Sequence, residues 1–424
     1  MRNLIEVIGA MREFVKSERD SELYMHLSVV DVFDWENSSL RRDRKCLGGL
    51  GKIIYDGKGT LGWANLGKLD ITGIDELNNR KRETIPSKNP LIDRASDEEL
   101  DNYFSMISDI FSYSDKKELS EGQLLKSYKN RFDLSKRFIV QHEVRTYFSC
   151  SSFGGIGYSL KNTTAFYGAE SASGTNNQIG KYNLIISPFT NSLSGDRGGD
   201  LNSLCDVGSS RSPKSILLSQ LAFGKLLYLF LEALLCDVNR CNVQADIDWK
   251  SLNLSRKLSI EENSPKNETI TGTIDEEGVR REPSDLVKSG KVVNVINNIG
   301  SPQFPRKTGS AYRKDFASMA AIRPSKIYVK PTGNKTPINI SEESIYISDW
   351  LNLEQGISWR SLNFSAMGMT PIGICQISSN LLDVLKNIKQ VFSDVEYVID
   401  GSIRTGSTEL EIDDSIKLRF IRFF

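Results

Sequence analysis

Histidine is nearly missing from this sequence, which holds only His26 and His142 among its 424 residues. A zinc peptidase needs two histidines about one helical turn apart, with a glutamate between them that deprotonates the bound water. His142 is followed by Glu143, but Thr146 and Tyr147 stand where a second histidine would complete HExxH or HExxxH. We therefore expect no metal at His142, and we expect His26, on an alternating strand, to be packed or solvent-facing. No motif places either histidine as a base for a serine or cysteine nucleophile.

Cysteine is scarce as well, and neither sign of charge is in excess. The six cysteines include no CxxC pair and are too few for a disulfide framework, so we expect reduced, mostly buried thiols. The chain has 54 basic and 54 acidic residues, which gives no general signal for a nucleic-acid surface. The one local basic cluster, Arg41–Lys45, is short and interrupted by Asp43.

Long apolar runs are also absent. None reaches the roughly 20 residues that a membrane-spanning helix needs. In the first 16 residues, charges separate the apolar Leu4, Ile5, Ile8, Met11 and Val15, which predicts an amphipathic helix and not a signal peptide. We therefore expect a cytoplasmic protein without membrane contact.

The glycine clusters and paired carboxylates allow a functional and a structural interpretation. Gly48–Lys52 and Gly154–Gly157 lack the spacing of GxxxxGK[ST] and of GxGxxG, so strand-edge glycines or bulges are favoured over a phosphate loop. The acidic stretch Asp196–Asp200 and the pair Asp413-Asp414 are typical of surface turns.

The length of the chain predicts two domains. We expect an α+β N-terminal domain over residues 1–185, with an antiparallel sheet and flanking helices. Asp56-Gly57 predicts a hairpin turn, and the acidic residues after Ser96 predict a helix over 96–113. The expected strands cover 26–33, 46–55, 60–64 and two segments between 136 and 167.

The C-terminal domain, residues 186–424, is expected to be mostly antiparallel β around a long central buried helix. Ser212-Pro213 is typical of a helix start, and the apolar residues that follow predict a buried helix over about 213–235. Residues 258–287 are polar with few large apolar groups, which predicts a flexible loop. A further helix is expected over 380–392, and strands over 291–296, 325–330, 344–348 and 374–377.

Four segments, in this order along the chain, resemble the TldD/PmbA family. Members of that family were named as modulators of DNA gyrase and act in proteolysis and peptide maturation. The segments are the hairpin region 36–64, the Ser212-Pro213 helix entry, the run from Gly290 through Lys307-Thr-Gly-Ser-Ala-Tyr-Arg313 to Arg323-Pro-Ser-Lys-Ile-Tyr-Val-Lys-Pro-Thr-Gly333, and Ile377–Ile388. The resemblance covers most of the chain.

The resemblance implies where a metal motif would lie. In the catalytic TldD-type subunits the central helix carries HExxxH, and a cysteine near the C-terminus completes the site. Here Gln220 and Lys225 align with the two histidines and Leu221 aligns with the glutamate, while the region 400–406 offers no cysteine. A lysine ammonium repels a divalent cation, and leucine cannot take a proton from water. The chain therefore resembles the TldE (PmbA) side, whose members lack the motif and pair with a TldD subunit.

Two functions remain in competition at this point. In the first, the chain is a TldE-like pseudo-peptidase without catalytic, cofactor-binding or metal residues of its own. It would form a dimer with a TldD-like subunit that holds zinc and cleaves unfolded peptides. In the second, the chain is a stand-alone homodimer that binds peptides or tailors them by metal-free chemistry. A direct DNA or gyrase partner finds no basic surface signal in the sequence.

Overall fold

The computed structural model describes most of the chain. The described residues are 2–18, 20–36, 39–55, 60–80, 83–86, 138–152, 156–168, 185–188, 213–236, 248–297, 308–318, 320–333, 344–358, 361–370 and 373–423. They are mostly β, with few helices and several sheets. The helix expected over 96–113 and the Asp56-Gly57 turn lie outside them.

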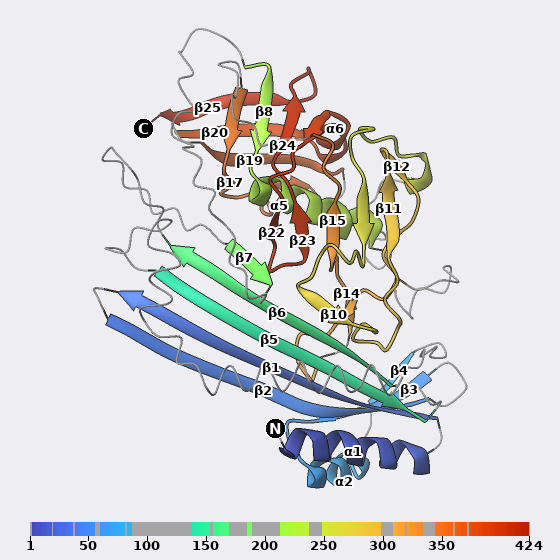
Figure 1. Cartoon of the computed structure of the whole chain (residues 1–424). Helices are drawn as coiled ribbons and strands as arrows, with labels where there is room; N and C mark the ends of the chain where they lie inside the picture. The colour runs from blue at the N-terminus through green and yellow to red at the C-terminus, as the bar shows by residue number, and fades with distance from the viewer. Residues whose placement is uncertain are drawn as a thin grey trace.

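Long antiparallel strands form the N-terminal half, as the alternating sequence pattern predicts (Figure 1). Two of them, β1 and β5, are central, and each is hydrogen-bonded to long neighbours. The strands are β1 (Ser21–Glu36), β2 (Ser39–Tyr55), β3 (Thr60–Leu66), β4 (Glu83–Pro86), β5 (Phe138–Ser151) and β6 (Ile156–Gly168). Gly48–Lys52 lies inside β2, which agrees with strand glycines rather than a phosphate loop.

Two helices cover one face of this sheet near its lower end in Figure 1: α1 (Arg2–Ser17), expected from its apolar stripe, and α2 (Ile71–Asn78). Asp70 caps α2 by accepting a hydrogen bond from the backbone N–H of Gly73. Because side chains alternate along a strand, Leu23 and Met25 of β1 face these helices and are fully buried. The opposite face of β1 is free to contact the rest of the chain.

The sheet continues from the N-terminal into the C-terminal half. Strand β7 (Ile185–Pro188) pairs with β6 on one side and with β22 (Glu396–Val398) on the other. Beyond β22 the order is β23 (Ile403–Thr405), β15 (Ile327–Val329), β9 (Ile260–Glu262), β11 (Ser284–Lys288) and β12 (Lys291–Val292), while β10 (Ile270–Gly272) pairs with β6. The predicted boundary at 185/186 thus falls within a strand of a continuous sheet, and the division into two domains stays a prediction.

Smaller sheets complete the C-terminal half, where a 3-10 helix (Trp249–Ser251) also lies. One contains β16 (Ser344–Ile347), β8 (Ser215–Leu218), β24 (Thr408–Glu411) and β21 (Ile388–Val391). Another contains β17 (Asp349–Trp350), β18 (Ile357–Ser358), β19 (Asn363–Thr370), β20 (Gly373–Asn380) and β25 (Lys417–Phe423). A two-stranded ribbon joins β13 (Ala311–Tyr312) to β14 (Ala321–Ile322). Three of the expected strands are therefore present as β15, β16 and β20, and only the first two residues of 291–296 are a strand.

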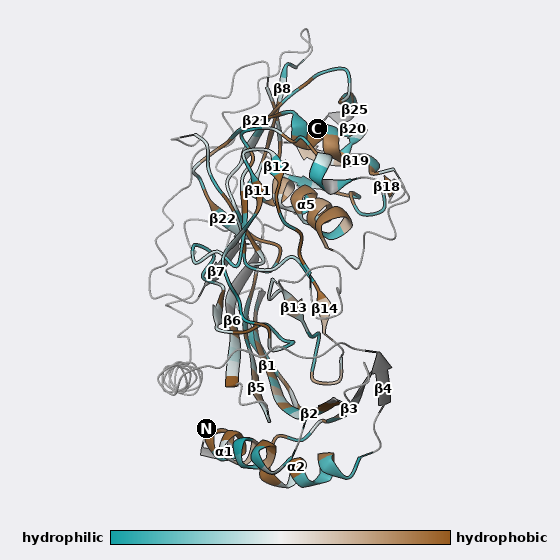
Figure 2. Cartoon of the chain, turned by 90° about the vertical axis from the view of Figure 1, so that its right-hand side faces the viewer, coloured by the Kyte–Doolittle hydropathy of each residue, from teal (hydrophilic) through white to brown (hydrophobic). Residues whose placement is uncertain are grey.

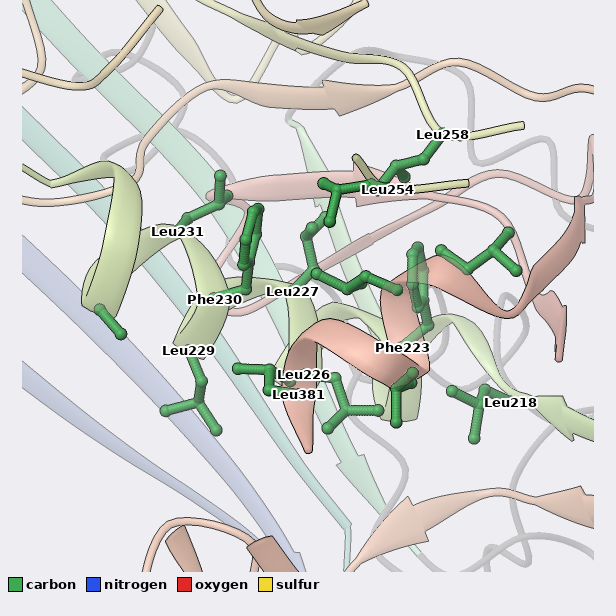
Figure 3. Close-up of a cluster of buried hydrophobic side chains, with 14 of the residues drawn as sticks. Leu218, Phe223, Leu226, Leu227, Leu229, Phe230, Leu231, Leu254, Leu258 and Leu381 are labelled. Atoms are coloured by element: carbon green, nitrogen blue, oxygen red, sulfur yellow. The ribbon is translucent and has the colours of Figure 1, made fainter. Parts of the chain in front are cut away.

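The long central helix expected over 213–235 is wrong in its extent. Residues 215–218 are strand β8, because they pair with β16 on one side and β24 on the other. The helix α5 (Gln220–Phe230) begins after Ser219, whose hydroxyl accepts the Ala222 N–H as a cap. A π-helical turn (Leu231–Leu235) follows it. The helix is nevertheless buried, and its leucines and phenylalanines pack among those of neighbouring segments (Figure 3).

Two further expectations are corrected. Residues 258–287, expected to be a flexible loop, contain β9, β10 and β11 joined by turns, because their polar side chains are buried in hydrogen bonds to the surrounding chain. The amide of Asn267, for example, donates to the carbonyl of Ile327 at 3.0 Å. The helix expected over 380–392 ends at Lys386 as α6 (Leu381–Lys386), since Ile388–Val391 pairs with β24 as a strand.

Candidate functional site

The three motif positions lie at the start of α5, and the first of them is held by a hydrogen bond to an aspartate. The Gln220 amide donates to the backbone carbonyl of Asp394 at 2.8 Å and to its Oδ2 at 3.0 Å. The same carboxylate accepts the Ser407 backbone N–H at 2.8 Å and the Ser407 hydroxyl at 2.7 Å. Gln220 therefore ties the helix start to the loops that follow β21 and β23.

Lys225 points to a different partner. Its Nζ lies 2.6 Å from Asp349 Oδ1, with 35% of the lysine side chain and 26% of the aspartate side chain exposed. Residues five apart on an α-helix are separated by roughly 140° around its axis. Gln220 accordingly contacts the loop after β21 and Lys225 contacts β17, so the two side chains do not converge on one point. Leu221 packs, half-buried, against the apolar core.

This set of donors does not fit a divalent metal ion. An ammonium has no lone pair to offer, leucine has no donor atom, and the Gln220 amide nitrogen is a hydrogen-bond donor. No group of three or more His, Cys, Asp or Glu side chains is arranged to hold a metal within the residues that the structure describes. The stretch 400–406 covers β23 and its flanking turns and contains no cysteine.

The other singled-out residues are dispersed. Four cysteines lie in the described ranges, Cys150, Cys236 and Cys375 buried and Cys46 exposed, and none of them is in a disulfide. Burial raises the pKa of Cys375 to about 11. Asp413 accepts the backbone N–H of Ser415 at 2.9 Å in a turn. The stretch Asp196–Asp200 lies outside the described residues.

The histidines are both buried on neighbouring strands. His142 lies on β5, opposite Asp31 of β1. His26 is fully buried, which decides between the packed and the solvent-facing interpretations in favour of packing.

No described helix is long and apolar enough to cross a membrane.

The sequence reasoning missed a second region, where charged side chains are buried between β1, β5 and residues 262–313. We call it the buried polar cluster. Its main members are Glu22, Tyr24, His26, Arg145, Tyr147, Glu262, Asp275, Glu276, Arg281, Tyr312 and Arg313. The strand members share the sheet face opposite α1 and α2, because their positions alternate with Leu23 and Met25.

Arg145, on β5, joins β1 to the segment that contains Glu276 and Tyr312. Its Nε donates to His26 Nε2 at 2.9 Å, its Nη1 donates to the Tyr312 hydroxyl, and its guanidinium lies 3.9 Å from the centre of the Tyr312 ring. Glu276 Oε1 lies 3.5 Å from the same Nε. Burial, with the positive charges of Arg145 and Arg313, lowers the pKa of His26 to about 3. His26 is therefore neutral at physiological pH.

Arg313 is the second arginine that joins distant segments of the cluster, and its side chain is almost completely buried. Its Nε donates to the Glu276 carbonyl at 3.0 Å and its Nη1 to the Ser318 carbonyl at 2.9 Å. The guanidinium stacks 4.3 Å from the ring centre of Tyr24, which in turn donates its hydroxyl to the carbonyl of Phe316 at 3.1 Å.

Glu262 and Asp275 form the acidic part of the cluster. The Ser310 hydroxyl donates to Glu262, and burial raises the pKa of this carboxyl to about 8. Asp275 instead accepts backbone N–H groups, from Val279 and Ala311 at 2.8 Å each. Glu262 is thus kept largely protonated at neutral pH, while Asp275 organises the backbone around it.

The segment Thr308–Arg313, quoted above for its family resemblance, supplies much of this cluster. Gly309 has φ of +69°, and a Cβ there would lie 2.7 Å from the Arg280 carbonyl oxygen, so the position requires glycine. Alternating charged residues on two buried strands, together with this segment, are the sequence signal that could have indicated the cluster.

Comparison with known proteins shows which protein family the sequence matches. The sequence profile of the PmbA/TldA metallopeptidase C-terminal domain matches residues 214–414. The part of the chain that this profile matches belongs to the PmbA/TldD metallopeptidase family. The resemblance seen in the sequence is thereby confirmed. No curated protein matches the chain at a significant level.

Solved structures share the fold over almost the whole chain. TldE from Thermococcus kodakarensis has a TM-score of 0.63 at 13% identity, covering 96% of this chain and 98% of that one. A proposed modulator of a DNA gyrase from Thermotoga maritima has a TM-score of 0.63 at 14% identity, covering 98% and 100%. Another from Bacteroides thetaiotaomicron has a TM-score of 0.58 at 11% identity, covering 98% and 99%. At these identities the likeness concerns the fold alone.

Both regions described above lie largely within the part of the chain that the PmbA/TldD profile matches. The motif positions Gln220, Leu221 and Lys225 are inside residues 214–414, as are Glu262, Asp275, Glu276 and the segment Thr308–Arg313. The strand residues of the buried polar cluster come from the half that precedes it. The family's C-terminal domain is therefore tied to the N-terminal sheet through charged side chains.

Proposed function

We propose that the chain is a TldE-like, non-catalytic subunit of a TldD/TldE-type metallopeptidase complex, acting in proteolysis or maturation of unfolded peptides. The observation that carries this proposal is the state of the three motif positions. Gln220 and Lys225 are engaged by Asp394 and Asp349, and Leu221 packs against the core, so none of the three offers a metal ligand or a base.

The proposal includes a partner protein and a cellular location. A TldD-like subunit would hold the zinc and perform the cleavage in a cytoplasmic dimer, while this chain contributes shape to the complex. The fold shared with TldE from Thermococcus kodakarensis supports this assignment.

The test compares the isolated chain, a TldD-type partner and the two together. We expect the isolated chain to bind no zinc tightly, to co-purify with the partner as a dimer, and to be required for peptide cleavage. Metal content by mass spectrometry, molar mass by light scattering and cleavage of an unfolded peptide are the three measurements. One tightly bound zinc per isolated chain, or full cleavage by the partner alone, would overturn the proposal.

A pair of variants separates a scaffold from a repurposed site. Gln220→Ala and Lys225→Ala should leave cleavage by the complex within about twofold, because neither side chain touches the reaction in a scaffold. Loss of activity in either variant, with the dimer intact, would instead favour the alternative of a stand-alone peptide-binding or peptide-tailoring homodimer.

A further inference from the structure

Strand β2 is much longer than the strand that covers its outer side. It pairs with β1 along its whole length, but β3 pairs only with its last part, from Leu50 to Tyr55. Among the described strands no other pairs with β2, so the first part of β2 forms the edge of the described sheet (Figure 1). The described side chains from Arg41 to Leu47 are all exposed. We call this segment the open β2 edge.

An open strand edge can accept another strand. Along such an edge, backbone N–H and C=O groups point outward in a row, and an extended peptide can hydrogen-bond to them. The open β2 edge is about 20 Å long at roughly 3.3 Å per residue, enough for a peptide of six or seven residues. This length is typical of strand addition in peptide recognition.

The side chains on the open β2 edge are basic on both faces. Arg42 and Arg44 lie on the face of Asp31, at 3.1 Å and 3.8 Å from its Oδ1. Arg41 and Lys45 lie on the other face, together with Asp43. Lys45 keeps 70% of its side chain exposed, and its ion pair with Asp43 is long at 3.9 Å. The edge is therefore positive although the whole chain is neutral.

Leu47 adds an apolar contact to this basic strand. It shares the face of Arg41 and Lys45, and 61% of it is exposed, the highest value among the exposed large apolar residues of the described chain. A strand laid along the edge would bury it. The next alternate positions of such a strand, on the same face, would meet Lys45, Asp43 and Arg41.

We propose that the open β2 edge binds an extended acidic segment of a partner protein by adding it as a further strand. Acidic side chains would meet Arg41 and Lys45, and an apolar one would meet Leu47. A second copy of the same edge fits poorly, because an antiparallel pair of these strands would bring arginines and lysines together. A peptide also matches the row of backbone groups, which a nucleic-acid phosphate chain does not. This proposal is independent of the proposed function.

The test uses a labelled extended peptide whose side chains on one face are, in order, leucine, glutamate, threonine and glutamate, so that they can meet Leu47, Lys45, Asp43 and Arg41. Its fluorescence anisotropy is followed as the full-length chain is added. We expect binding at low salt that weakens as salt rises. Arg41→Glu combined with Lys45→Glu should weaken it at least about tenfold, because two attractions become repulsions. Amide hydrogen exchange in residues 41–47 should slow when the peptide is bound.

Two controls make the result specific. Lys257→Glu combined with Lys291→Glu changes the same charge at exposed sites on other segments and should leave the affinity within about twofold. A probe of equal charge with two prolines, which cannot complete a ladder, should bind at least about tenfold more weakly.

Three outcomes would overturn the proposal. If the chain does not bind the acidic probe, the charges serve only to keep other strands from the edge. If the proline probe binds equally well, charge alone is responsible and no strand is added. If single-stranded DNA of matched charge binds more tightly than the peptide, the edge is a nucleic-acid surface.

Discussion

The core around α5 and the buried polar cluster are equally hidden from solvent but opposite in chemistry. Around α5, Phe223, Leu227 and Phe230 are fully buried among other apolar side chains, and Figure 2 shows this helix as mostly brown. In the buried polar cluster, Arg145 and Arg313 are equally inaccessible and contact carbonyls, carboxylates and tyrosine rings, while Nη2 of Arg145 has no hydrogen-bond partner among the described residues. The helix at the motif positions thus serves packing, while the buried charges lie where the two halves of the chain meet.

The two regions should respond differently to substitution. An apolar core loses contacts and gains a cavity when a side chain is shortened, and the loss follows the volume removed. A buried ionic cluster instead leaves an uncompensated charge or polar group when one partner is removed. Four predictions follow this contrast, from the largest expected effect to the smallest.

Arg313→Met should cost about 3–5 kcal/mol of folding stability, because it leaves the Glu276 carbonyl and the Tyr24 ring without their buried cationic partner. Urea unfolding followed by tryptophan fluorescence measures it. Arg419→Met, at an exposed position, is the matched control and should stay within about 0.5 kcal/mol. A cost below about 1 kcal/mol for Arg313→Met would show that the cluster does not stabilise the fold.

Leu227→Ala should cost about 3 kcal/mol, because the leucine is fully buried in the α5 core and its removal leaves a cavity. Leu221→Ala in the same helix is the control. Leu221 is only half-buried, so we expect about 1 kcal/mol. Equal costs for the two variants in the same urea experiment would contradict the assignment of α5 as a packing helix with one exposed side.

Glu262 should make the fold less stable as pH rises. Its folded pKa of about 8 lies above the ordinary value of 4.5, so the stability it contributes is complete below about pH 4.5 and is lost as pH rises to about 8. His26 acts in the opposite direction, because its folded pKa of about 3 lies below 6.5 and its contribution is lost as pH falls below 6.5. Between pH 6.5 and 8 the Glu262 effect, about 1.4 kcal/mol per pH unit at most, should dominate over that of His26.

Glu262→Gln tests this window, because glutamine can accept the Ser310 hydroxyl but does not titrate. We expect the slope of folding stability against pH between 6.5 and 8 to become smaller by the contribution of one titrating proton, at most about 1.4 kcal/mol per pH unit. Burial also raises the pKa values of Asp275 and Glu276, so some slope should remain. An unchanged slope in thermal melts across this range would mean that Glu262 is ionised in the folded protein.

Lys225→Met should have the smallest effect, below about 1 kcal/mol, because the ion pair with Asp349 is partly exposed and such pairs contribute little. Thermal melting compares it with Asp349→Asn. A loss above about 2 kcal/mol would place Lys225 with the buried polar cluster rather than with the surface of α5.

The sequence-based prediction was correct where a regular pattern of apolar and polar side chains repeats over many residues. The alternation in 26–33 and 137–148 and the apolar stripe of residues 1–16 predicted strands and a helix, which the structure contains with longer or slightly shifted bounds. The prediction failed at the start of the expected central helix. Ser212-Pro213 has the composition of a helix start, but Ser215–Leu218 finds strand partners on both sides, Ser344–Ile347 and Thr408–Glu411, far away in sequence. Pairing of this kind overrides local propensity.

The polar segment 258–287 failed for a related reason. Polar composition predicts solvent exposure only when the polar groups have no partners inside the protein. Here Glu262 finds Ser310, Asn267 finds the carbonyl of Ile327, and Asp275 finds backbone N–H groups of its own turn and of Ala311. None of these pairings between distant residues can be read from the segment itself.

The sequence by itself determined what chemistry the motif positions lack. Glutamine, leucine and lysine at 220, 221 and 225 supply neither of the two imidazoles nor the carboxylate of the peptidase motif, whatever the fold. Only the tertiary structure decided what these residues do instead. Helix geometry turns Gln220 and Lys225 in different directions, and the folded chain places Asp394 beside one and Asp349 beside the other.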